Sequence, residues 1–111
     1  METKSLGKIS YVKFGYGGYQ DAMFGISIGL DTQSGGCCDF RGMWGIDTKV
    51  GDYTKWTEVD RDERFAETMR YVNQLLIDAK KDDVTKLLGV PIEVTRENNT
   101  LKSWRILKEV L

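Results

Sequence analysis

The chain has 111 residues with 16 Lys and Arg against 17 Asp and Glu, a net charge of −1, and no His. Its length predicts a single domain, residues 1–111, and its 41% hydrophobic and 30% charged residues are typical of a globular protein. The absence of His removes the most common general base and metal ligand. No apolar run approaches the roughly 20 residues that would span a membrane. The near-neutral charge argues against a nucleic-acid partner held by counterion release.

The first half of the chain predicts three strands, because apolar and polar residues alternate in three segments. We expect these strands at 9–14, 22–30 and 37–44. The middle strand carries bulky side chains such as Ile26 on one face and little more than Gly25 and Ser27 on the other. That nearly bare face leaves room for another molecule to approach the backbone.

The second half predicts two helices followed by a hairpin. A long loop over 45–57 ends at Thr57, a favourable N-cap, and the apolar residues that follow recur every three or four positions to about Lys81. A second, short helix is expected over 84–88. The tail then predicts two strands joined at Asn98-Asn99, because Asn tolerates the positive φ of a tight turn.

The elements therefore follow the order β-β-β-α-α-β-β along the chain. We expect an α+β fold in which an antiparallel sheet carries both helices on one face. The last strand, over 101–110, has apolar side chains on both faces, for example Trp104 on one and Leu107 on the other. Because one layer of helices covers only one face of a sheet, this pattern predicts a homo-oligomer.

Two segments combine aromatic and polar side chains in a way that suits a small, flat, negatively charged ligand. The glycine-rich turn over 15–21 precedes a strand and not a helix, so it is not a phosphate-binding loop, but Tyr16 and Tyr19 can stack on a base. At the start of the long helix, Arg61 can pair with a phosphate. Both segments also have a structural interpretation, as a flexible turn and as a helix cap stapled by Trp56. The predicted ligand-binding residues are Tyr16, Tyr19, Gln20, Asp21, Arg41, Trp56, Asp60 and Arg61.

No group of residues predicts catalysis, a metal or a cofactor. Cys37 and Cys38 have no further Cys or His to complete a metal site, and adjacent cysteines do not reach ordinary disulfide geometry. Carboxylates are present, but no spacing singles out a pair, and no nucleophile motif such as G-x-S-x-G occurs. We therefore expect a non-enzymatic protein. The lack of a charged segment before an apolar stretch predicts no signal peptide.

Three motifs, GYGGYQDA at 15–22, WTEVDR at 56–61 and LKSWRIL at 101–107, resemble a widespread family of small proteins from tailed phages and prophages. The resemblance covers nearly the whole chain and implies a phage accessory protein in the bacterial host cytoplasm. By analogy with small phage proteins that counter host defence, we expect it to sequester a nucleotide-like defence signal. One alternative is an inhibitor that binds a host defence protein through its tryptophans. Another is an accessory protein that binds single-stranded nucleic acid.

Overall fold

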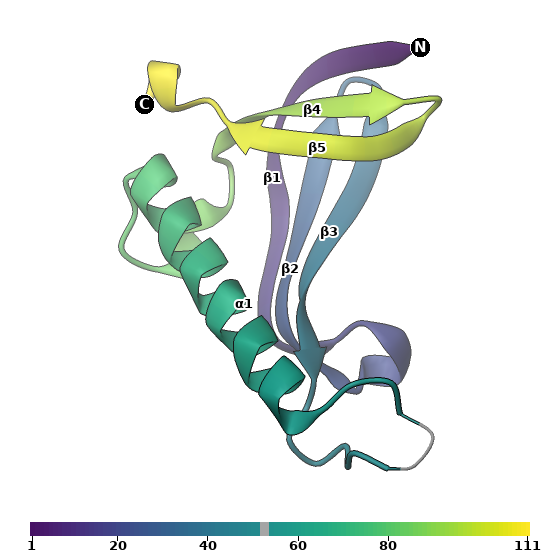
Figure 1. The fold of residues 1–111 in the computed structure, drawn as a ribbon. Coiled ribbons are helices and arrows are strands. Elements are labelled where there is room, and N and C mark those ends of the chain that lie inside the picture. Colours follow the sequence, from purple (N-terminus) through teal and green to yellow (C-terminus); the bar gives the residue numbers. More distant parts are fainter. Residues whose placement is uncertain (52–53) are drawn as a thin grey trace.

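The computed structural model describes residues 1–51 and 54–111, which form an antiparallel sheet and one α-helix. The five strands are β1 (Glu2–Gly17), β2 (Met23–Thr32), β3 (Gly35–Trp44), β4 (Pro91–Glu97) and β5 (Thr100–Ile106). The helix α1 (Glu58–Ala79) connects β3 to β4 (Figure 1). These elements confirm the α+β class with an antiparallel sheet.

The order of elements differs from the prediction, because the segment over 84–88 does not form a second α-helix. It makes a 3₁₀ turn, η2 (Val84–Leu87), which ends where Leu88 leaves the helical region and Gly89 adopts a φ of 83°. Two more such turns, η1 (Tyr19–Asp21) and η3 (Lys108–Val110), lie where we expected a loop and the end of a strand. The helical layer therefore consists of α1 alone.

The long first strand organises the sheet, because it belongs to both halves of it. The strand order is β3-β2-β1-β4-β5, and β1 pairs with β2 over 7–17 and with β4 over 2–8. A bulge at Ser10, between the paired residues Ile9 and Tyr11, interrupts the register near the middle of β1. The hairpin β4–β5 consequently runs across the top of β1–β3 instead of alongside them (Figure 1).

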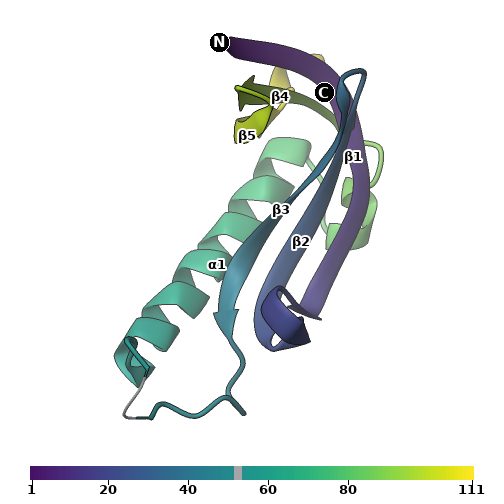
Figure 2. The same cartoon turned by 90° about the vertical axis from the view of Figure 1, so that its right-hand side faces the viewer.

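The hydrophobic core lies between the sheet and α1, which crosses the concave side of the curled sheet (Figure 2). Ile26, Ile28 and Leu30 of β2 are at most 1% exposed, and they belong to one core cluster with Val72 and Leu75 of α1. Burying a side chain of this size contributes about 2 kcal/mol. The predicted bulky face of β2 is thus the face that holds the helix.

The helix begins where the sequence predicts. The Thr57 hydroxyl accepts a hydrogen bond from the Asp60 backbone N–H at 3.1 Å, and the Asp60 carboxylate accepts one from the Thr57 N–H at 2.8 Å. This reciprocal pair is a capping box, which satisfies two backbone donors at the helix start. The helix ends at Ala79, and its C-cap residue, Lys80, adopts the left-handed conformation with a φ of 57°.

The prediction that the last strand is apolar on both faces is wrong, because β5 contains a bulge. Leu101 lies opposite Arg96 and Ser103 lies opposite Thr95, so Lys102 has no partner on β4. An extra residue shifts the alternation of side chains by one position. Leu101 therefore shares the inner face of β5 with Trp104 and Ile106, which oppose the buried residues of β4. The homo-oligomer stays a prediction, but the pattern of side chains on β5 no longer supports it.

The open side of the curled sheet is bridged at one end by Arg96 of β4. Its guanidinium is buried and donates to the Thr32 hydroxyl at 3.2 Å and to the Gly35 carbonyl at 3.0 Å. Thr32 is the last residue of β2 and Gly35 is the first residue of β3, so the two acceptors flank the turn between these strands. This side chain therefore holds the hairpin β4–β5 against the end of β2 and the start of β3.

Candidate functional site

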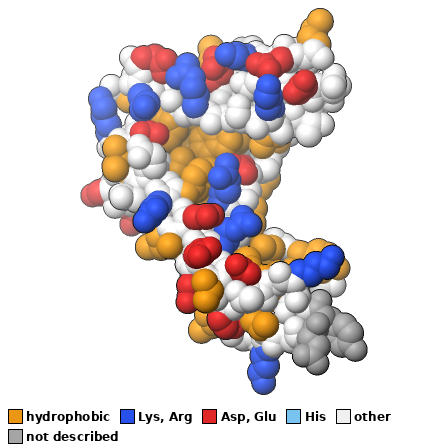
Figure 3. Space-filling model, in the orientation of Figure 1, with side chains coloured by type: hydrophobic (Ala, Val, Ile, Leu, Met, Phe, Trp, Pro, Cys, Tyr) orange, Lys and Arg blue, Asp and Glu red, His pale blue; other side chains and the backbone are white. Residues whose placement is uncertain are grey.

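A solvent-open cleft of about 570 Å³ lies between β3, α1 and β5, beneath the hairpin (Figure 3). Strands β3 and β5 are the two edges of the sheet, and the cleft occupies the gap that the curled sheet leaves between them. Its lining includes the apolar side chains Leu75, Leu101 and Ile106 and, around them, side chains that carry charges or hydroxyls. A cleft of this kind can enclose a small ligand on several sides.

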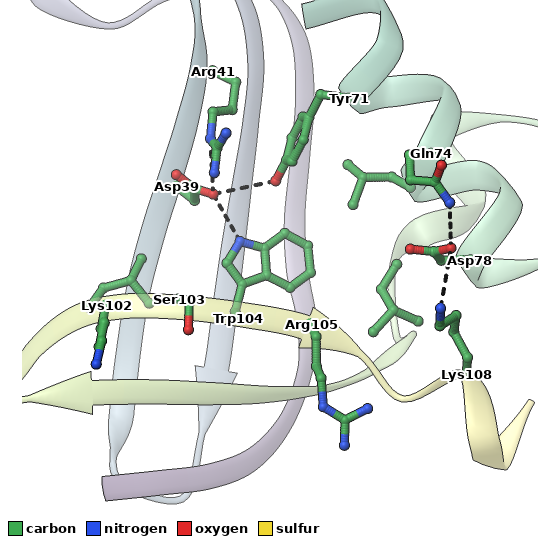
Figure 4. Close-up of a pocket in the computed structure, with 13 residues that line it drawn as sticks. Asp39, Arg41, Tyr71, Gln74, Asp78, Lys102, Ser103, Trp104, Arg105 and Lys108 are labelled. Atoms are coloured by element: carbon green, nitrogen blue, oxygen red, sulfur yellow. Dashed lines mark hydrogen bonds and ion pairs between the residues drawn. The ribbon is translucent and has the colours of Figure 1, made fainter. Parts of the chain in front are cut away.

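Asp39 is the centre of the polar network in the cleft (Figure 4). Its Oδ2 accepts a hydrogen bond from the Trp104 indole at 2.8 Å and from the Tyr71 hydroxyl at 3.3 Å, and it lies 3.6 Å from Nε of Arg41. These four side chains come from β3, α1 and β5. One carboxylate oxygen thus connects both edges of the sheet to the helix.

Arg41 is presented to the cleft by this network. Its guanidinium carbon lies 4.6 Å from the centre of the Tyr71 ring, a cation–π contact. Its side chain is 56% exposed, and within 1–51 and 54–111 its two Nη atoms make no hydrogen bond. Arg41 pairs with Asp39 through Nε at 3.6 Å, whereas the other cations of the cleft pair with carboxylates through terminal nitrogens: Lys102 with Glu2 and Glu97, Arg105 with Glu109, and Lys108 with Asp78. Arg41 is therefore the cation best placed to receive an anion.

Burial, together with the neighbouring Asp39 carboxylate, raises the pKa of the Tyr71 hydroxyl well above its ordinary value. Burial is the larger cause, because it disfavours the charged phenolate, and the negative charge of Asp39 acts in the same direction. Tyr71 thus stays protonated and keeps donating to Asp39 throughout the neutral range.

This raised pKa predicts a loss of stability in alkali. Above about pH 10 a tyrosine in the unfolded chain loses its proton, while Tyr71 in the folded protein keeps it. The unfolded state then binds fewer protons, so the free energy of unfolding should fall as the pH rises through this range. We expect Tyr71→Phe to show a shallower fall in chemical denaturation at a series of pH values. Equal slopes for the two proteins would contradict this account.

Of the eight residues predicted to bind a ligand, Arg41 lines the cleft and the other seven do not. Arg61 is only 2% exposed, and its guanidinium donates to the Thr48 carbonyl, lies 4.7 Å from the centre of the Trp56 ring and 3.5 Å from a Glu58 oxygen. Asp60 is the partner of Thr57 in the capping box. In this structure Trp56, Asp60 and Arg61 therefore fix the start of the helix and the preceding loop, as the structural interpretation of that motif predicts.

The glycine-rich turn lies away from the cleft. Tyr19 is 66% exposed and meets the Trp44 ring edge-on at 6.2 Å, and the ring of Tyr16 meets Phe24 at 5.6 Å. Gln20 and Asp21 belong to η1 and adopt φ values of 54° and 53°. Neither the cleft nor two further cavities among the described residues are lined by residues of this turn or of the helix start, 56–61.

The fold and the cleft define an α+β protein whose curled sheet is left open at a partly polar cleft. No protein-family model, curated protein or solved structure matches the chain. Among the described residues, no helix is both long and apolar enough to cross a membrane, and no three or more His, Cys, Asp or Glu side chains lie together as metal ligands would. The resemblance to phage proteins stays a prediction.

Proposed function

We propose that the protein binds a small, planar anion of the nucleotide type in the cleft between β3, α1 and β5. The observation that carries the proposal is the guanidinium of Arg41, held against the Tyr71 ring and near Asp39, with neither Nη atom hydrogen-bonded to any residue that the structure describes. An arginine whose side chain is held in position while its Nη atoms can still donate is able to form two parallel hydrogen bonds to a phosphate or carboxylate. Its cation–π contact and the nearby Asp39 limit the motion of the side chain before a ligand arrives.

The walls of the cleft suit the flat part of such a ligand. The Trp104 ring lines the cleft, and its indole N–H is held by Asp39 at 2.8 Å, so the ring is fixed in place. Leu75 and Ile106 add apolar surface nearby. The volume of about 570 Å³ lies in the range of roughly 300–1,000 Å³ that is usual for small-molecule sites.

The chemistry of the cleft favours binding over conversion of the ligand. A general base needs a carboxylate lone pair directed at the substrate, whereas Oδ2 of Asp39 receives hydrogen bonds from Trp104 and Tyr71, and Oδ1 of Asp78 receives one from Gln74. The raised pKa of Tyr71 keeps its proton in place at neutral pH. We therefore propose that the ligand is held unchanged, so that the protein lowers the free concentration of a nucleotide-like signal by sequestering it.

Isothermal titration calorimetry with AMP, UMP and inorganic phosphate tests this function. We expect at least one nucleotide to bind more tightly than phosphate, because the aromatic wall adds to the contact with Arg41. Losing a charge-assisted hydrogen bond costs roughly 1.5–3 kcal/mol, so Arg41→Gln should weaken binding by about tenfold or more.

The matched control is Arg70→Gln, which makes the same change at an exposed position of α1 outside the cleft. It should bind the nucleotide as the wild type does. The proposal fails if no compound binds, or if the Arg41 and Arg70 variants have the same affinity.

A further inference from the structure

The face of β1–β3 that points away from α1, here called the outer face, has a row without side chains. Gly15 of β1 lies opposite Gly25 of β2, which in turn lies opposite Gly42 of β3. Because register partners share a face of the sheet, the three glycines form a continuous strip of bare backbone. The neighbouring outer positions carry small residues on β2, such as Ser27 and Gly29.

The ring of Phe40 lies at the Gly42 end of this glycine row. Its Cζ is 2.9 Å from the place where a Cβ of Gly42 would stand, and its Cε1 is 3.8 Å from the equivalent place at Gly17. The ring therefore extends from β3 towards β1 across the bare backbone, where a larger residue would displace it. The ring rests on the sheet, and Phe40 is only partly buried, so part of its surface is accessible to a base.

Other aromatic side chains surround this platform. Tyr11 is 49% exposed and stands on the outer face beside Gly29, with its Cβ 2.7 Å from where a Cβ of that glycine would be. Trp44 lies at the far end of the same face, opposite Met23, and Tyr19 packs edge-on against it. The exposed rings of Tyr11 and Tyr19 and the partly buried rings of Phe40 and Trp44 offer several stacking positions to flat groups.

The charge of the outer face is positive, although the net charge of the protein is −1. Lys8 and Lys13 occupy outer positions of β1 on either side of Tyr11, and within 1–51 and 54–111 neither forms an ion pair. Where β1 pairs with β2 and β2 with β3, Asp31 is the carboxylate at an outer position and lies opposite Lys8, so Lys13 is the lysine there without a carboxylate as its register partner. A polyanion is complementary to this arrangement.

We propose that the outer face binds single-stranded nucleic acid, with bases stacked on Phe40 and its aromatic neighbours and the backbone phosphates close to Lys8 and Lys13. Aromatic platforms flanked by cations are the usual means of binding unpaired strands without sequence preference. A duplex keeps its bases stacked on each other and cannot use the rings. A second copy of this chain in a two-fold arrangement would bring the same lysines near each other, so charge favours the polyanion.

Fluorescence anisotropy with a labelled oligothymidylate tests this inference. Stacking of one base contributes roughly 1–3 kcal/mol, so Phe40→Ala should weaken binding at least fivefold, whereas Phe40→Tyr keeps the platform and should retain most of the affinity. Lys13→Glu should weaken binding about tenfold, and Lys81→Glu, the same charge change at the end of α1, should change it less than twofold. With two phosphate contacts, a tenfold rise in salt should weaken binding by about 25-fold.

The outcomes separate this surface from the cleft. Arg41→Gln should leave oligonucleotide binding unchanged, and AMP should not compete with the oligonucleotide. The proposals for the cleft and for the outer face can therefore be disproved independently of each other. The inference is overturned if the oligonucleotide does not bind, if duplex DNA binds equally well, or if Lys13→Glu and Lys81→Glu behave alike. It is also overturned if Phe40→Ala only dissociates a dimer in analytical ultracentrifugation and leaves strand binding intact.

Discussion

Asp39→Ala is expected to lower the free energy of unfolding by about 3 kcal/mol, measured by urea denaturation. The substitution removes the acceptor of the Trp104 indole and of the Tyr71 hydroxyl, and it removes the carboxylate next to Arg41. Each half-buried donor that loses its partner contributes to the cost. The two edges of the sheet also lose the side-chain bridge across the cleft, so the effect should exceed that of an ordinary surface substitution.

Asp39→Asn is the matched variant, because its amide oxygen can still accept from Trp104 while the charge is lost. We expect it to retain more than half of the stability that alanine loses. Trp104→Phe in the Asp39→Ala background should cost less than Trp104→Phe alone, since the shared hydrogen bond is already absent. A loss below about 0.5 kcal/mol for Asp39→Ala, the size of an ordinary surface effect, would contradict the bridging role.

Arg61→Ala is expected to be similarly destabilising, at about 3 kcal/mol, for a different reason. The side chain is 2% exposed, and it fills the space between the helix start, the Trp56 ring and the loop that contains Thr48. Alanine would leave a cavity there and would deprive the Thr48 carbonyl of its donor. Guanidinium denaturation followed by tryptophan fluorescence measures this loss.

Arg61→Met separates packing from charge. The Nε of Arg61 is buried without a hydrogen-bond partner among the described residues, so burying this guanidinium carries an energetic cost. A hydrophobic residue of similar length often replaces a buried ion pair at little cost, and methionine should recover at least half of the loss. Equal destabilisation by alanine and methionine would instead mean that Arg61 stabilises the fold through its hydrogen bond to Thr48 and its ion pair with Glu58. Neither variant should alter AMP binding, because Arg61 is remote from the cleft lining.

The sequence predicted those parts of the fold that depend on local patterns. Thr57 as a helix cap, the turn at Asn98-Asn99 with φ values of 53° and 67°, and the buried face of β2 all follow from neighbouring residues. The full length of β1 was not predicted. Apolar and polar residues alternate only weakly in its first half, which is a strand because it pairs with β4. The bulge at Lys102 also escaped prediction, since nothing in the LKSWRIL segment distinguishes a bulge from regular alternation.

The candidate site was harder to predict because it is formed by long-range packing. Asp39, Tyr71 and Trp104 are separated by more than thirty residues from one another and meet only because α1 crosses the open side of the sheet. Arg41 was predicted as a ligand-binding residue, but the side chains that surround it were not. Arg61 was predicted as a ligand contact from its place at a helix start, yet the same place allows it to be buried under Trp56. The local pattern does not distinguish these two outcomes.

The three tryptophans provide the most direct test of the cleft, because each reports a different part of the molecule. Trp104 lines the cleft, Trp44 lies on the outer face, and Trp56 packs on Arg61 at the helix start. In a proton–nitrogen NMR spectrum of the isotope-labelled protein, addition of AMP should move the indole resonance of Trp104 in a saturable manner and leave those of Trp44 and Trp56 in place. A Trp104 resonance that stays fixed at saturating AMP, or a shift of Trp44 alone, would contradict binding in the cleft.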